Sequence, residues 1–199
     1  MGKKLFSGLF FLFCPVFLLA QAVAPVTSKR ATVTAGGYFS FGGSDYGQNL
    51  SGPNANRTHP NIYGPGLYAD FNYRVWRNIG VGVEGEARFL DYYHSPQDHL
   101  GAGTKEQNFL AGPRVTYELG RRWLPYAKFL AGGSRFHYPT FISNKWWDYT
   151  TYAVGAGIDF RWTRHITIRP GDFEYQHWDF PPTGLTPWVY SAGVSYRLF

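Results

Sequence analysis

One segment decides the fold: Ile79-Gly80-Val81-Gly82-Val83-Glu84-Gly85-Glu86-Ala87-Arg88-Phe89. Its odd positions carry apolar or small side chains, and its even positions carry only glycine, glutamate and arginine. A repeat of two residues is the period of a β-strand, in which successive side chains point to opposite faces. The segment therefore predicts a strand with one apolar face and one charged face.

The same alternation recurs on both sides of this segment. Six further stretches show it, over residues 31–43, 67–75, 107–119, 124–136, 152–162 and 188–199. A seventh, over 166–178, changes parity around Pro170-Gly171-Asp172. Because proline and glycine are tolerated where the ladder of hydrogen bonds is interrupted, this change predicts a β-bulge. The chain is thus expected to form eight strands.

The gaps between these strands alternate in length. Short gaps fall at 76–78, 120–123 and 163–165, whereas long gaps fall at 44–66, 91–106, 137–151 and 179–187. Short turns on one side and long loops on the other are typical of outer-membrane barrels. We therefore predict an all-β fold, an eight-stranded antiparallel up-and-down transmembrane β-barrel, with both chain ends on the short-turn, periplasmic side.

Composition excludes several other classes. Of the 199 residues, 20% are aromatic and only 16% are charged, which is incompatible with a disordered chain or a coiled coil. The net charge of +6 comes from scattered lysines and arginines, so a nucleic-acid partner is not expected.

The first residues have the pattern of a secretory signal peptide. Lys3 and Lys4 precede an apolar stretch over 5–20, and the small-residue triplet Ala20-Gln21-Ala22 follows. This order of charge, apolar run and small residues predicts a signal peptide over 1–22, cleaved from a barrel domain over 23–199. Cys14, the only cysteine, lies within the signal, so neither disulfides nor thiolate chemistry are expected in the mature chain.

The tryptophans indicate which face meets lipid. All seven lie near a predicted strand end, as expected for aromatic girdles at the membrane interfaces: Trp76, Trp123, Trp146, Trp147, Trp162, Trp178 and Trp188. In a soluble barrel the large rings would concentrate in the middle of the strands. The apolar parity is therefore expected to face lipid.

The polar parity is then expected to line the lumen. It carries six acids and seven bases at its central positions: Asp70, Glu84, Glu86, Glu118, Asp159 and Glu174, with Arg74, Arg88, Arg114, Lys128, Arg161, Arg169 and Arg197. Arginine is favoured over lysine in enclosed ion pairs because of its planar fork of donors. We predict an ion-pair network in which Arg74, Arg88, Arg114 and Arg161 pair with Glu84, Glu86, Glu118 and Asp159.

The end of the chain supplies a family resemblance. The ending Gly193-Val194-Ser195-Tyr196-Arg197-Leu198-Phe199 resembles the last strand of small outer-membrane barrels of the OmpA type. The resemblance implies that Tyr196, Leu198 and Phe199 form the signal recognised by the barrel-assembly machinery, although Leu198 takes the parity at which the family usually has its final Phe. Peptidoglycan anchoring is not expected, because the resemblance does not include that family's periplasmic domain.

Three function classes follow from this reading. The first is a non-catalytic envelope component of the bacterial outer membrane, surrounded by lipid and lipopolysaccharide, whose outer loops mediate adhesion or recognition. The second is a narrow pore or a small-solute transport barrel that uses the same lumen charges. The third is an enzyme acting on lipid A, with His94, Asp98, His99 and His137 as candidates, although their spacing matches no established metal or catalytic motif. We expect no enzyme activity, cofactor or metal.

Two further expectations concern the third long loop. Trp146 and Trp147, with Tyr149 and Tyr152, are assigned either to the outer lipid interface or to a recognition patch for a sugar or host ligand. Arg135 and Lys145 lie near the same rim and are candidates for contact with lipopolysaccharide phosphates.

Overall fold

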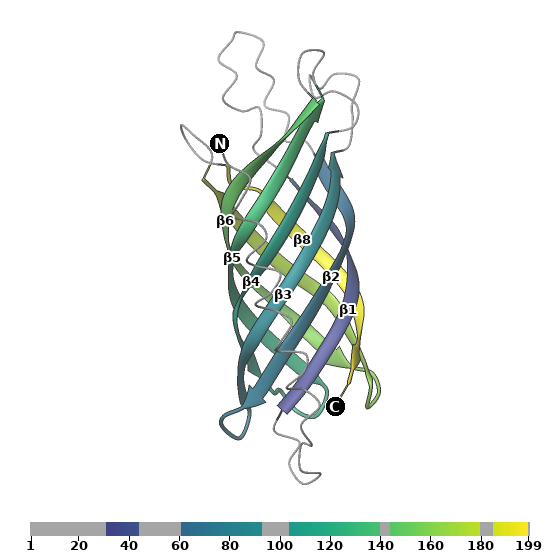
Figure 1. The fold of residues 1–199 in the computed structure, drawn as a ribbon. Coiled ribbons are helices and arrows are strands. Elements are labelled where there is room, and N and C mark those ends of the chain that lie inside the picture. The colour runs from purple at the N-terminus through teal and green to yellow at the C-terminus, as the bar shows by residue number, and fades with distance from the viewer. Residues whose placement is uncertain (1–30, 44–60, 93–103, 140–143, 180–184, 199) are drawn as a thin grey trace.

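A computed structural model of the chain describes residues 31–43, 61–92, 104–139, 144–179 and 185–198. These residues form one closed antiparallel barrel in which each strand pairs with its neighbour in sequence (Figure 1). The strands are β1 (Ala31–Gly43), β2 (Asn61–Arg74), β3 (Ile79–Tyr92), β4 (Lys105–Tyr117), β5 (Trp123–Pro139), β6 (Asn144–Arg161), β7 (Ile166–Trp178) and β8 (Trp188–Arg197). The predicted fold class is confirmed.

The barrel closes where β1 meets β8. Their register runs from Thr34 opposite Arg197 to Gly43 opposite Trp188. The amide of Leu198 extends this pairing by donating to the Val33 carbonyl at 2.9 Å. Closure leaves no open edge along the barrel wall, so every strand can satisfy its backbone groups within the membrane.

The predicted bulge in β7 is present. The pairing of β7 with β8 shifts between Arg169 and Asp172, and its pairing with β6 shifts between Ile158 and Phe160 on the β6 side. The one extra residue of β7 lets Arg169 and Asp172 both face inward, where both are buried. The bulge therefore keeps charged side chains on the inside along the whole of β7.

The prediction of a third long loop over 137–151 is wrong. β5 continues to Pro139 and β6 begins at Asn144, with an unbroken register that pairs Phe136 with Trp147. The two strands rise beyond their neighbours as a hairpin (Figure 1). Above the membrane neither face must be apolar, so the alternation fades while the backbone pairing continues. β2 likewise starts at Asn61, within the predicted first loop.

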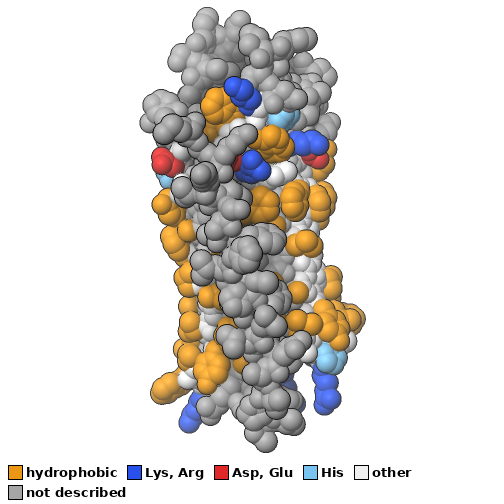
Figure 2. Space-filling view, in the orientation of Figure 1, with side chains coloured by type: hydrophobic (Ala, Val, Ile, Leu, Met, Phe, Trp, Pro, Cys, Tyr) orange, Lys and Arg blue, Asp and Glu red, His pale blue; other side chains and the backbone are white. Residues whose placement is uncertain are grey.

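The two faces of the wall are chemically opposite. Apolar side chains such as Phe71, Val83, Val115 and Val154 are exposed on the outside, and the alternate positions are buried and largely polar or charged. On the face that Figure 2 shows, apolar side chains cover the visible part of the wall, and charged side chains appear only toward the two ends. This is the arrangement of a barrel whose outer surface contacts hydrocarbon.

No helix in the described part of the chain is long and apolar enough to cross a membrane.

Candidate functional site: the filled lumen

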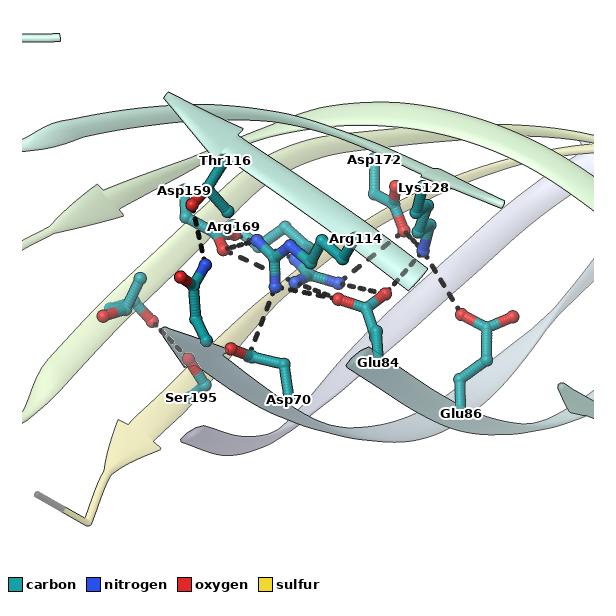
Figure 3. A network of polar contacts seen from close by, with 12 residues as sticks. Asp70, Glu84, Glu86, Arg114, Thr116, Lys128, Asp159, Arg169, Asp172 and Ser195 are labelled. Atoms are coloured by element: carbon teal, nitrogen blue, oxygen red, sulfur yellow. Dashed lines mark hydrogen bonds and ion pairs between the residues drawn. The ribbon is translucent and has the colours of Figure 1, made fainter. Parts of the chain in front are cut away.

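The centre of the lumen holds a compact cluster of charges (Figure 3). Glu84 on β3 accepts hydrogen bonds from Arg114 on β4 and Arg169 on β7, both at 2.9 Å. Asp159 on β6 accepts from Arg169 Nε at 2.9 Å and from Arg114. Arg114 also forms an ion pair with Asp70 on β2 at 3.2 Å. Side chains from five strands thus meet inside the barrel.

A second cluster surrounds the ammonium of Lys128 on β5. Four carboxylates lie within ion-pair distance of its Nζ: Glu84 at 2.7 Å, Asp172 at 2.7 Å, Glu174 at 2.5 Å and Glu86 at 3.3 Å. Oxygens of Glu84, Glu86 and Asp172 lie close enough together to hold a metal ion. In this structure the Lys128 ammonium lies among them, and Arg88 and Arg169 pair with Glu86 and Glu84, so the cluster is an internal ion-pair site.

Arg88 on β3 completes the network toward the outer end. It donates to Glu174 Oε2 at 2.7 Å, to Glu86 Oε2 at 3.1 Å and to the hydroxyl of Tyr38 at 3.0 Å. Its side chain is fully buried. Glu174 therefore bridges Arg88 and Lys128, and the two clusters form one continuous network.

Tyrosine rings fill the space between these charges. The guanidinium of Arg169 lies 3.8 Å from the centre of the Tyr68 ring, and that of Arg114 lies 3.8 Å from the centre of the Tyr126 ring. Cation–π contacts of this kind stabilise a guanidinium where water is excluded. Gly155 leaves room for the network, because a Cβ there would meet Glu174 Cγ at 2.7 Å.

The inner end of the lumen is more open. Glu118 accepts from Arg74 Nη2 at 2.6 Å and from Arg161, so that one carboxylate serves two arginines. Arg74 is 42% exposed, and Arg161 and Arg197 are partly buried. The predicted partners thus meet: Arg74 and Arg161 contact Glu118, Arg88 contacts Glu86, and Arg114 contacts Glu84 and Asp159.

The outer end of the lumen is closed by apolar side chains. We call this cluster the outer plug; it consists of Ile62, Leu90, Tyr92, Phe136, Trp178, Leu185 and Val189, with Tyr149 packed against it. The assignment of Trp178 to the membrane interface is wrong, because only 1% of its side chain is exposed. It shares the inward parity of Glu174 and Gln176, and its ring nitrogen donates to Gln176 Oε1 at 3.0 Å.

The other predicted interface tryptophans are all exposed. Trp76, Trp123 and Trp162 lie at the short-turn end, and Trp146 and Trp188 lie toward the long-loop end. Trp147 is 54% exposed, but it pairs with inward-facing Phe136 and therefore lies on the inner face of the hairpin, above the outer plug. Its assignment to the lipid girdle is corrected accordingly.

Two buried acids were missed from the sequence. Asp172 was interpreted only as a bulge residue, yet it contacts Lys128. Glu106 was placed in a loop, yet it is buried in β4 and accepts hydrogen bonds from Asn108 at 2.8 Å and Tyr92 at 3.0 Å. Both share the parity of inward neighbours, Glu174 and Asn108, and that signal could have identified them.

Several predictions lie outside the described residues. They are the signal peptide over 1–22, the loop residues His94, Asp98 and His99, and the terminal Phe199. His137, the remaining enzyme candidate, lies in β5 with its ring 5.0 Å from that of Trp146.

The fold and the filled lumen define the class: a small outer-membrane barrel whose interior is occupied by its own side chains. The family model for the outer membrane protein β-barrel domain matches residues 11–197, and the chain belongs to this family.

Two solved structures illustrate the likeness in fold. Neisserial surface protein A superposes with a TM-score of 0.55 at 15% identity, and Ail, the attachment invasion locus protein of Yersinia pestis, with 0.52 at 16%. Each match covers 84% of this chain and 97% of the other. Among curated proteins, none matches the chain.

Proposed function

We propose that this protein is a non-conducting, non-catalytic component of the outer membrane whose protruding β5–β6 hairpin makes contacts at the cell surface. The observation that carries the proposal is the two-part filling of the lumen. The ion-pair network occupies the middle, and the outer plug lies between that network and the outer opening. A barrel of eight strands encloses only enough space for side chains to fill.

The contacts across the lumen support a closed interior. Arg88 and Glu84 on β3 bind Glu174 and Arg169 on β7, and these two strands are four positions apart in a ring of eight. Opposite walls are thus bridged directly. A continuous water path would require these buried ion pairs to separate, which is costly in an enclosed space.

Conductance in planar bilayers tests the closed interior. The refolded protein should give no steady single-channel steps, and Arg135→Gln, an exposed change outside the lumen, should behave in the same way. Steady steps whose size changes in Glu84→Gln or Arg114→Gln would support the alternative of a narrow pore or a solute-transport barrel.

Lipid A analysis tests the absence of catalysis. Mass spectrometry of lipid A from cells with and without the protein should show the same acyl chains and the same phosphates. A difference that disappears in His137→Ala, or in a variant lacking His94 and His99, would support the alternative of an enzyme.

The proposed surface contact rests on the hairpin's own side chains. Arg135 Nε donates to Asp148 Oδ1 at 2.7 Å, and its guanidinium lies 5.8 Å from the centre of the Trp146 ring. These contacts hold a cation and an indole ring together on the outer face of the hairpin, and exposed Lys145 adds a second cation at its tip, on the parity of Trp147. Such a surface suits phosphate groups of lipopolysaccharide or an anionic surface ligand.

A binding assay with phosphorylated and dephosphorylated lipopolysaccharide tests this contact. The unmodified protein should prefer the phosphorylated form, and the double change Arg135→Gln with Lys145→Gln should remove the preference. Arg77→Gln at the opposite end of the barrel is the matched control. An unchanged preference in the double variant would overturn the assignment of the hairpin.

The last strand is the proposed contact for the barrel-assembly machinery. Tyr196 and Leu198 are exposed on the lipid-facing parity of β8. We expect Leu198→Asp to slow membrane assembly in cells while leaving refolding in detergent unaffected. Equal effects in both settings would argue for a purely structural role.

A further inference from the structure

The periplasmic end of the barrel is strongly cationic. The described residues at this end, over 31–34, 72–80, 116–124, 160–167 and 196–198, contain one acid, Glu118. They contain seven arginines: Arg74, Arg77, Arg121, Arg122, Arg161, Arg164 and Arg197. In Figure 2 basic side chains protrude from the lower end of the barrel, and no acidic side chain is visible beside them. Such a field concentrates anions at the opening.

A cavity lies directly inside this end. Its volume is about 50 Å³, enough for more than one water molecule. Hydroxyl and amide side chains line much of it, including Thr34, Asn72, Thr116 and Thr167. Arg114 also contributes to its lining, together with its two ion-pair partners Asp70 and Asp159. The cavity is therefore a polar vestibule between the ion-pair network and the periplasm.

Four arginines and three acids line the vestibule in all, and three of those arginines lie at the level of a single acid, Glu118. Arg74, Arg161 and Arg197 all contribute to the lining, and both oxygens of Glu118 are used by Arg74 and Arg161. Arg197 has no ion pair within the described residues. At this level the vestibule carries more positive than negative charge.

Two buried donors in the vestibule lack an acceptor. The Nε atoms of Arg161 and Arg197 are both buried and have no hydrogen-bond partner in the described structure. Burying an N–H group without an acceptor costs free energy, and the cost is greater when the group is charged. A water molecule or an anion in the cavity would supply the acceptor for these donors.

We propose that the vestibule binds a small inorganic oxyanion of the phosphate or sulfate type from the periplasm. Such an anion offers oxygens to several donors at once, and arginine is the side chain best suited to bind it. The threonine hydroxyls provide further donors around it. The occupant is a soluble anion and not a lipid headgroup, because the lining side chains face the lumen and the headgroups lie outside the wall.

Unfolding of the full chain refolded in an uncharged maltoside detergent tests this proposal, with inorganic phosphate as the probe. At equal ionic strength, phosphate should raise the unfolding midpoint well above its value in chloride. The rise should saturate as the phosphate concentration increases. Arg197→Gln should weaken the apparent phosphate affinity at least tenfold. Arg121→Gln, a change on the exposed rim that does not line the vestibule, should alter it by less than about threefold.

A second measurement keeps the proposal testable if Arg197→Gln folds poorly. Phosphate should shift the Nε resonances of Arg161 and Arg197 in NMR spectra of the unmodified protein and leave that of Arg121 in place. The proposal is overturned if phosphate acts no more strongly than chloride, or if the Arg121 resonance shifts as much as those of the vestibule. If anionic lipid shifted these Nε resonances in the absence of inorganic phosphate, the proposal would also be overturned, because the anion site would then lie outside the barrel.

Discussion

Arg88 and Glu174 join opposite walls of the barrel: Arg88 Nη1 on β3 donates to Glu174 Oε2 on β7 at 2.7 Å. The two residues are 86 positions apart in sequence and four strands apart in the ring. Both side chains are buried. The pair therefore contributes to the barrel as an internal brace, and its members depend on each other for charge compensation.

Removing one member of this pair should destabilise the barrel strongly. We expect Arg88→Met to lower the free energy of unfolding by about 3 to 5 kcal/mol, because Glu174 and Glu86 lose a buried cation. Urea unfolding in lipid vesicles measures this loss. The double variant with Glu174→Gln should recover part of it. Arg135→Gln, which breaks an exposed pair, should change stability by less than about 1 kcal/mol.

Lys128→Ala should convert an ion-pair cluster into a site for a divalent cation. Without the ammonium, the oxygens of Glu84, Glu86 and Asp172 remain close together and lack their central charge. Because Ca²⁺ is bound by carboxylate oxygens, millimolar Ca²⁺ should raise the urea midpoint of the variant. It should have no such effect on the unmodified protein or on Lys105→Ala, an exposed change. An unaltered midpoint in Lys128→Ala would contradict the prediction.

Adding a methyl group should have opposite effects inside and outside the wall. A Cβ at Gly155 would meet Glu174 Cγ at 2.7 Å and Lys128 Cε at 3.0 Å, so Gly155→Ala should cost about 1 to 3 kcal/mol. A Cβ at Gly85 would meet nothing closer than 4.0 Å, so Gly85→Ala should be neutral or slightly stabilising. Unfolding of the two variants, compared directly, provides the measurement. Equal losses of stability in the two variants would show that the lumen has room for an added methyl group at Gly155.

A charged side chain on the outer wall should lower the free energy of unfolding only where the wall lies deep in the membrane. Val83 lies four residues into β3 and is 56% exposed, whereas Ile79 is the first residue of that strand. Val83→Arg should destabilise by about 2 to 4 kcal/mol, and Ile79→Arg by about 0 to 1 kcal/mol. Folding into bilayers at a series of urea concentrations measures both. Similar losses at the two positions would argue against the assigned membrane depth.

The alternation predicted most of the wall, because a barrel with one lipid face imposes its period directly on the sequence. Val83 and Glu84 show this most clearly, with one exposed outside and the other buried inside. The prediction failed where lipid no longer imposes the pattern. Around Trp147 the hairpin leaves the membrane, and strand pairing continues through residues that resemble a loop.

The partners within the lumen were harder to predict than its composition. Parity places Glu174 and Arg88 inside, but the strand stagger and the closure of the ring decide that they meet across the axis. The prediction for Trp178 failed for a different reason. Its position at a strand end suggested the aromatic girdle, although its parity with Glu174 indicated the interior. In that case side-chain direction was the better guide than position along the strand.

The bulge at Pro170 and Gly171 sets which way the outer half of β7 is turned. Strict alternation from Arg169 would send Phe173 and Tyr175 into the interior and leave Asp172 and Glu174 against hydrocarbon. Deleting Gly171 would leave a single residue between Arg169 and Asp172, so regular alternation without a bulge would return Asp172 and Glu174 to the inner face. Which ions of β7 are buried therefore depends on how the backbone accommodates one extra residue, and an uncharged proline and glycine decide whether two carboxylates face the lumen or the lipid.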